Sequence, residues 1–170
     1  MYIILIGGGT GSGKTTVTNK IIERLGNDNC VILPMDNYYK DMGHVPLEER
    51  KKYNYDHPDM IEHTLMVRHV KALLSGKNVE LPEYDFAQYT RSGSTITISP
   101  RPILLIEGIF ALYYEELRAI ADLKIFVDAE GDEEQYLPAH HSHPVAPMRR
   151  PQSAPATEPW TMPVMPICAS

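Results

Sequence analysis

The sequence predicts an α/β fold: a three-layer sandwich with a mainly parallel sheet between helices. Three observations lead to this fold class. Short apolar runs of strand length recur at residues 2–6, 31–33, 103–106 and 123–127, and helical apolar patterns lie between several of them. A glycine-rich stretch joins the first apolar run to the first helical pattern. Alternation of strands and helices in this order is typical of an open, mainly parallel sheet covered on both faces.

The glycine-rich stretch fits the pattern of a phosphate-binding loop, in which a glycine, four spacers and a second glycine precede lysine and threonine. Its backbone N–H groups and the following helix N-terminus are suited to bind phosphate oxygens. Lys14 is expected to reach the β- and γ-phosphates of a nucleoside triphosphate, and the Thr15 hydroxyl to bind Mg²⁺. The predicted nucleotide-binding residues are Gly8, Gly9, Thr10, Gly11, Ser12, Gly13, Lys14, Thr15 and Thr16.

Two other interpretations of this stretch fit the sequence less well. A glycine-rich strand-to-helix turn with an accidental lysine accounts less well for the buried strand before the stretch and the helix after it than a phosphate-binding loop does. A dinucleotide-binding fold would use Asp36 as the ribose-binding acid, but no G-x-G-x-x-G spacing is present. The loop therefore indicates a P-loop NTPase-type fold.

Length, net charge and cysteine content limit the kinds of partner and location that are expected for the chain. The 170 residues are one domain's worth, and the net charge of −6 with no clustered Lys and Arg argues against binding nucleic acid. Cys30 and Cys168 match no disulfide framework or metal-binding spacing, and no apolar run is long enough to cross a membrane. With no signal-peptide pattern, the chain is expected to be cytoplasmic.

Acidic residues follow two of the predicted strands. Asp36 comes after residues 31–33 and Glu107 after residues 103–106, so both are expected at the carboxyl edge of the sheet, where ligands bind in such folds. A further strand, residues 123–127, ends at Asp128. Residues 46–52 are predicted to form a short exposed helix and residues 111–121 a longer one.

A third helix is predicted to start at Asp59, with Glu62 completing a capping box, and to end at Gly76. Its apolar stripe is expected to consist of Ile61, Leu65, Met66, Val70, Leu73 and Leu74, with His63 and His69 on its exposed surface. Residues 79–81 and 95–98 alternate as half-buried strands, which predicts a small hairpin whose long aromatic loop spans residues 82–91.

The character of the chain changes after Gly131. Residues 138–170 hold 8 of the 14 prolines and no glycine, and they show neither helical nor strand periodicity. We therefore divide the chain into a core at 1–130 and a proline-rich, disordered tail at 131–170. His140, His141 and His143 are not expected to form a metal site, because no fourth ligand is spaced to complete one.

Five segments, spanning residues 1–129, resemble the uridine (uridine–cytidine) kinases of the phosphoribulokinase/uridine kinase superfamily. They read, in order, GGTGSGKTT, MDNYYKD, NYDHPD, PEYDFAQYTR and LLIEGIFAL. The resemblance implies that Asp36 is the catalytic base, working with Lys14, and that Glu107 binds Mg²⁺ opposite Thr15. It also implies a substrate-binding set of Asp56 at the ribose hydroxyls, Tyr84 and Phe86 at the base, Tyr89 and Ile109.

Simpler structural roles remain open for some of these residues: Asp36 could cap its strand, and Tyr84 and Phe86 could pack the hairpin. Tyr89 stands where many members of the family have a histidine, so the preference between uridine and cytidine does not follow from the resemblance. The family also continues into an arginine-rich lid helix and a final strand, which are missing from this sequence. We interpret residues 131–170 as a replacement of that ending, such as a shift of reading frame.

The resemblance implies an enzyme of pyrimidine salvage that uses ATP and Mg²⁺ to phosphorylate the ribose 5′-hydroxyl of uridine or cytidine, giving the nucleoside monophosphate and ADP. The expected partners are the nucleoside and ATP, with no nucleic acid or membrane, and formation of a homo-oligomer is left open. Two alternatives are retained: a lid-less nucleotide-binding protein with little catalysis, and a kinase of another small alcohol such as a sugar phosphate.

Overall fold

The computed structural model of the chain describes residues 1–128. The predicted division at residue 130, the proposed disorder of residues 131–170 and the histidines at 140, 141 and 143 lie outside the described residues. Within the described part, no helix is long and apolar enough to cross a membrane.

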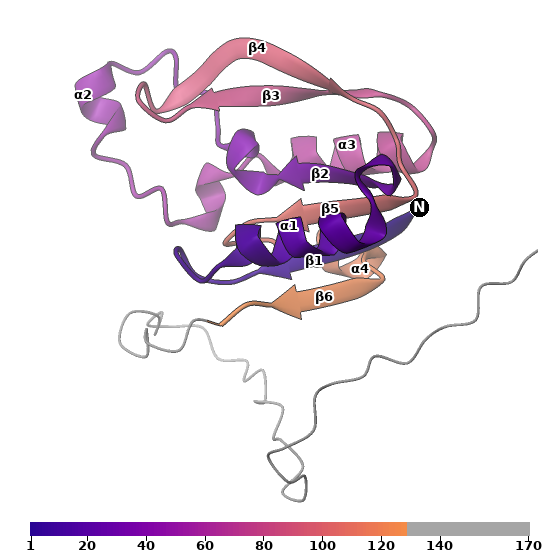
Figure 1. Ribbon diagram of the computed structural model, residues 1–170. Coiled ribbons are helices and arrows are strands. Elements are labelled where there is room, and N and C mark those ends of the chain that lie inside the picture. The colour runs from indigo at the N-terminus through magenta and orange to yellow at the C-terminus, as the bar shows by residue number, and fades with distance from the viewer. Residues whose placement is uncertain (129–170) are drawn as a thin grey trace, which may run out of the picture. The chain divides into compact units, whose positions relative to one another are not determined.

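Four parallel strands form the main sheet, as the sequence predicts (Figure 1). Their order is β2 (Cys30–Pro34), β5 (Ile103–Glu107), β1 (Tyr2–Gly7) and β6 (Leu123–Phe126). The central strands β1 and β5 carry continuous apolar runs because both of their faces are covered. Parallel pairing brings the carboxyl ends of all four strands to one edge of the sheet.

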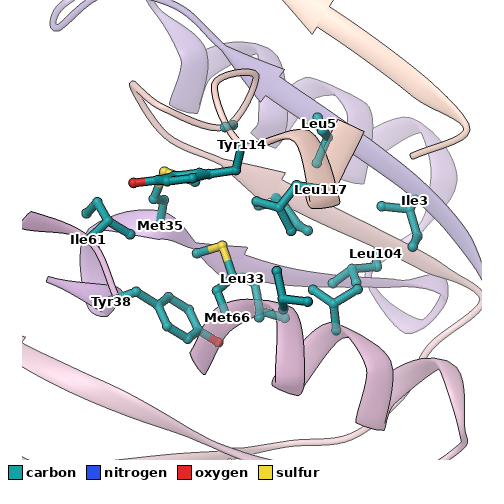
Figure 2. Packing of buried hydrophobic residues seen from close by; sticks show 14 of the residues in the cluster. Ile3, Leu5, Leu33, Met35, Tyr38, Ile61, Met66, Leu104, Tyr114 and Leu117 are labelled. Carbon is teal, nitrogen blue, oxygen red and sulfur yellow. The ribbon is translucent and has the colours of Figure 1, made fainter. Parts of the chain in front are cut away.

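Helices cover both faces of the sheet, which confirms the predicted three-layer sandwich. On one face, Ile4, Ile6 and Leu105 pack against Ile21 and Ile22 of α1 (Lys14–Leu25). On the other face lie α3 (His63–Leu74) and α4 (Glu115–Ile120). Figure 2 shows the second cluster, whose fully buried members include Ile3, Leu5, Leu33, Met35, Met66, Leu104 and Leu117.

The predicted hairpin is present, but its loop is shorter than expected. β3 (Val79–Asp85) and β4 (Thr90–Ile98) pair antiparallel as a separate two-stranded sheet. Pairing resumes beyond an irregularity between Pro82 and Tyr84, so only residues 86–89 form the turn. The predicted 82–91 loop was wrong because its aromatic residues continue the two strands.

The predicted start of α3 was also wrong. Residues Pro58–Met60 form a 3₁₀ turn in which the His57 side chain accepts the Asp59 N–H, and α3 begins at His63 without a side-chain cap. Ile61 is fully buried but extended, since it forms a β-bridge with Tyr39. A helix from Asp59 would break this bridge. The predicted end is confirmed, because the helix stops at Leu74 and Gly76 follows in a left-handed conformation.

The prediction that both histidines of α3 lie on its exposed surface was wrong. The His63 ring stacks on Tyr114 at 4.7 Å between centroids, and the His69 Nδ1 lies 2.9 Å from the buried Tyr38 hydroxyl. Both are only half-exposed. Because burial is the main influence, the pKa of His69 is lowered, and Arg68 and Arg91 lower it further.

The helix predicted at 111–121 is confined to α4, and turns occupy the preceding residues. Tyr114 is extended instead of helical, and its hydroxyl donates to the Pro58 carbonyl at 2.5 Å. Three short elements complete the path: the 3₁₀ turns at Asn27–Asn29 (η1) and Met35–Tyr38 (η2), and the exposed α2 (Leu47–Arg50), which lies within its predicted range.

Candidate active site

The phosphate-binding loop (residues 8–15) lies between the end of β1 and the first turn of α1. Gly8 has a φ of 153°, and a Cβ there would approach the Val127 carbonyl oxygen to 2.2 Å. Gly13, which precedes the helix, has a φ of 87°, a left-handed conformation that other residues rarely adopt. Gly8 is needed because the loop closes tightly against the segment after β6, and Gly13 because of its left-handed backbone conformation.

One pocket at the carboxyl edge of the sheet contains this loop and the two predicted acidic residues. It has a volume of about 200 Å³. It is lined by Thr10, Gly11, Lys14, Thr15, Pro34, Asp36, Glu107, Gly108 and Ile109. The structure therefore brings together residues from the first, second and fifth strand ends, as expected for an open parallel sheet.

Lys14 is the cation of the pocket. Its Nζ donates to the Gly9 carbonyl at 2.5 Å, which links the helix back to the loop. Partial burial lowers the pKa of Lys14, while the nearby Asp36 and Glu107 carboxylates act in the opposite direction. An incoming phosphate would offer the ammonium group a charged acceptor in place of the carbonyl oxygen.

Asp36 lies in η2, directly after β2, and its side chain borders the pocket. Asp36 is exposed to solvent, but neighbouring protein atoms displace part of the water around its carboxylate. Burial therefore raises the pKa of Asp36, Lys14 lowers it, and Glu107 raises it again. A carboxylate with a raised pKa accepts a proton more readily than an ordinary one, which suits a general base.

Glu107 ends β5 and has a partner that the sequence analysis missed. The Thr18 hydroxyl, which is completely buried, lies 3.0 Å from the Glu107 Oε2 and 3.0 Å from the Lys14 carbonyl oxygen. Thr18 thus ties the carboxylate to the first turns of α1. Its position one helical turn after Lys14, on the buried face of α1, was the available signal.

The donor set of the pocket suits a hard divalent cation. The described residues contain no group of three His, Cys, Asp or Glu side chains that could hold a metal ion by themselves. Mg²⁺ needs no such group, since it is usually bound by one or two carboxylates together with substrate phosphates and water. Thr15 and Glu107 would supply protein oxygens to such an ion. Asp36 lines the same pocket and interacts electrostatically with Glu107.

A cluster of five aromatic rings gathers around the hairpin turn. The centroid distances are 5.1 Å for Tyr84–Phe86, 5.2 Å for Tyr39–Tyr84, 5.3 Å for Tyr55–Tyr89 and 5.7 Å for Tyr39–Tyr55. Phe86 remains 59% exposed. The structure thus brings together the predicted Tyr84, Phe86 and Tyr89, and it adds Tyr39 and Tyr55, which the sequence analysis had not selected.

Of the predicted substrate-binding residues, Ile109 lines the phosphate pocket and the others do not. Asp56 is exposed in the turn beside Tyr55, with its N–H bonded to the Asn54 side chain. The Tyr114 hydroxyl holds the nearby Pro58 carbonyl, so this turn is tied to the segment that follows β5. The site therefore has two parts: the phosphate pocket, and the aromatic cluster with Asp56 beside it.

The chain is similar to known proteins over most of its described length. Residues 3–135 match the model of the phosphoribulokinase/uridine kinase family. The chain is 47% identical over 131 residues to the uridine kinase of Deinococcus deserti and 48% identical over 130 residues to that of Staphylococcus epidermidis. These matches cover 77% and 76% of this chain but only 63% of each relative, so the chain spans less than two thirds of their length.

Solved structures give the same fold. A possible uridine kinase from Bacillus stearothermophilus superposes with a TM-score of 0.56 at 25% identity, covering 74% of this chain and 69% of that one. A putative fructose transport system kinase from Silicibacter sp. TM1040 gives 0.61 at 25% identity, covering 74% and 64%. From the family match and these relatives, the chain belongs to the phosphoribulokinase/uridine kinase family.

Proposed function

We propose that this chain carries the catalytic core of an ATP-dependent pyrimidine nucleoside kinase, which phosphorylates the ribose 5′-hydroxyl of cytidine or uridine. The observation that carries this proposal is that Lys14, Asp36 and Glu107 line one pocket with the phosphate-binding loop. Phosphoryl transfer needs this combination: a cation at the transferred group, an oxygen-rich metal site and a carboxylate beside the attacking hydroxyl.

In the proposed reaction, the nucleoside 5′-oxygen attacks the γ-phosphorus of ATP while Asp36 accepts the hydroxyl proton. The bond between the γ-phosphorus and the β–γ bridging oxygen breaks, and ADP leaves. Lys14 and the loop N–H groups offset the negative charge of the phosphates. When bound, Mg²⁺ would neutralise further charge on the phosphates, held by Thr15 and Glu107.

The nucleoside would occupy the second part of the site. Asp56 is exposed and can accept hydrogen bonds from both ribose hydroxyls. Tyr84 and the exposed Phe86 offer ring surface on which a pyrimidine can stack. Tyr89 carries a neutral hydroxyl that can donate and accept, and we propose that it narrows the choice of base in favour of cytidine.

A second candidate is a nucleotide-binding protein with very slow phosphoryl transfer. Of the described residues that line the phosphate pocket, only Lys14 is a cation. Arginines that neutralise the transferring phosphoryl group accelerate such reactions by roughly 10³–10⁵-fold. A chain that lacks them would bind ATP·Mg²⁺ but turn over slowly.

An ADP-release assay with uridine, cytidine, ribulose 5-phosphate or no acceptor tests the proposal, with calorimetry of ATP·Mg²⁺ binding in parallel. We expect ATP to bind, and ADP release to depend on a nucleoside. Release that depends on ribulose 5-phosphate would instead identify a sugar phosphate kinase. Binding of ATP without nucleoside-dependent release would support the second candidate, and no binding of ATP would contradict both.

A further inference from the structure

Tyr89 has an unusual backbone conformation. Its φ is 51°, and among the described residues it is the only non-glycine residue with a positive φ. It closes the four-residue turn 86–89 and precedes the first residue of β4. A residue with a Cβ adopts this left-handed conformation only when its surroundings compensate for the steric cost.

The residue after Tyr89 is fixed by its side chain. Thr90 is 9% exposed, and its hydroxyl donates to the Asp41 Oδ1 at 2.7 Å and accepts the Met42 N–H at 2.9 Å. The same Asp41 oxygen accepts the Gly43 N–H at 2.9 Å. These bonds lower the pKa of Asp41, with the Thr90 hydroxyl as the largest cause. Thr90 is therefore held to the 41–43 segment.

The residue before Tyr89 is fixed from the same side of the molecule. Arg50, at the end of α2, donates to the Gln88 carbonyl at 2.8 Å. Its other guanidinium nitrogens donate to the Val45 carbonyl at 2.6 Å and the Gly43 carbonyl at 3.1 Å. One planar group thus connects the hairpin turn with the 43–45 segment, a geometry that a lysine cannot reproduce.

The hydrogen bonds of Thr90 and Arg50 thus hold the residues on both sides of Tyr89. The ring packs on Tyr55, with 5.3 Å between centroids, within the aromatic cluster. If the backbone relaxed to an extended conformation, the Cβ would point in a different direction and the ring would leave this contact. Thr90 and Arg50 do not line the phosphate pocket, and their hydrogen bonds fix the backbone on either side of Tyr89, so we expect them to act through the turn.

We propose that Thr90 and Arg50 are positioning residues that hold Tyr89 in its left-handed conformation and thereby set the choice of base at the nucleoside site. The effect on the choice of base rests on the proposed function. The part that concerns the conformation of Tyr89 stands independently of it.

The test compares Thr90→Val, which keeps the size of the side chain but removes both hydrogen bonds, with Thr90→Ser, which keeps the hydroxyl. Thr97→Val is the matched control: Thr97 lies on the same strand, and its hydroxyl donates to the exposed Glu80 on the neighbouring strand. For each full-length chain, the coupling between the Tyr89 amide and α protons is measured by NMR with labelled tyrosine. Calorimetry gives the affinities for cytidine, uridine and ATP·Mg²⁺.

In Thr90→Val we expect the Tyr89 coupling to shift toward the extended value, and the affinity for the preferred nucleoside to fall roughly tenfold, as for a lost hydrogen bond. The ratio of the cytidine and uridine affinities should approach one, and ATP·Mg²⁺ affinity should stay unchanged. Thr90→Ser and Thr97→Val should behave like the original chain. Arg50→Lys should reproduce the Thr90→Val result, which guards against misfolding of one variant.

An unchanged Tyr89 coupling in both Thr90→Val and Arg50→Lys would overturn the proposal. A changed coupling with an unchanged affinity ratio would overturn its second half, the effect on base choice. If the original chain binds no nucleoside at all, the proposed function fails, and the NMR comparison alone decides whether these residues position Tyr89.

Discussion

Replacing Thr18 by valine tests whether the buried hydroxyl orients Glu107 for metal binding. Valine has nearly the same shape as threonine, so the substitution leaves no cavity and removes only the hydroxyl. Two contacts disappear: the one at 3.0 Å to the Glu107 carboxylate and the one at 3.0 Å to the Lys14 carbonyl. The second is minor, because that carbonyl already belongs to the helical backbone of α1.

The expected effects of Thr18→Val on stability and on metal affinity follow from the position of Glu107. A hydrogen bond to a charged group contributes roughly 1.5–3 kcal/mol. Glu107 borders an open pocket, so water can replace part of this contact, and we expect the free energy of unfolding to fall by only about 1 kcal/mol. Metal binding depends more strongly on orientation, and loss of such a supporting contact typically weakens it roughly 10–100-fold.

The assay is a Mg²⁺ titration of ATP binding by calorimetry, combined with urea unfolding. In Thr18→Val the Mg²⁺ concentration at half-saturation should rise at least tenfold, with a small loss of stability. Thr18→Ser keeps the hydroxyl and should restore the Mg²⁺ response. If Thr18→Val loses stability but responds to Mg²⁺ like the original chain, the residue is structural and Glu107 needs no orienting partner.

Four further substitutions address the rest of the site. Calorimetry and turnover should separate Lys14→Ala, which weakens ATP binding, from Asp36→Asn, which keeps binding but lowers turnover roughly 10²–10⁴-fold; loss of ATP binding in Asp36→Asn would point to a structural or metal-only role. Because the pKa of Asp36 is raised on folding, its ionisation costs stability. Urea unfolding should therefore show Asp36→Asn gaining stability over the original chain as the pH rises from the ordinary Asp pKa through the raised value. Tyr89→His should change the ratio of cytidine to uridine efficiency, and equal ratios in both forms would remove Tyr89 from the specificity argument. In Gly108→Ala the new Cβ would lie 2.4 Å from the Met35 Cβ, so unfolding should show a loss of about 1–3 kcal/mol and assays a lower turnover with ATP binding retained; an unchanged turnover would show that the Asp36 segment tolerates the shift.

The parts of the fold that follow from local sequence were predictable. The apolar runs of β1 and β5, the loop between β1 and α1, and the Gly76 ending of α3 all depend on residues that are close together in the chain. Apart from the hairpin loop, whose residues pair locally, the errors in the helix boundaries involve contacts between distant residues. Ile61 leaves the helical pattern to pair with Tyr39, and Tyr114 stays extended to reach the Pro58 carbonyl.

The same distinction applies to the site. Asp36 and Glu107 were found because carboxyl ends of parallel strands meet at one edge, a rule that needs no knowledge of side-chain packing. Arg50 and Thr90 were missed because nothing near them in the chain reveals their partners. For Thr18, the position one turn after Lys14 indicates a buried hydroxyl but does not reveal the distant partner Glu107. The contacts between these residues and their partners join positions 38 to 89 residues apart, except for the bonds that Arg50 and Thr18 make within their own segments.

The short segment after Asp36 connects the two parts of the proposed site. Asp36 borders the phosphate pocket, while Asn37 donates to the Pro82 carbonyl at 2.9 Å and the Tyr39 carbonyl accepts from Arg91 at 3.1 Å. The hairpin that carries the aromatic cluster is therefore bonded to the residues next to the proposed base. Neither bond uses a side chain of the aromatic cluster, so we expect that a change in one of those side chains can alter which base is accepted while the backbone spacing between Asp36 and the proposed nucleoside site is kept. Substitutions could then change the choice of base without changing the rate of phosphoryl transfer.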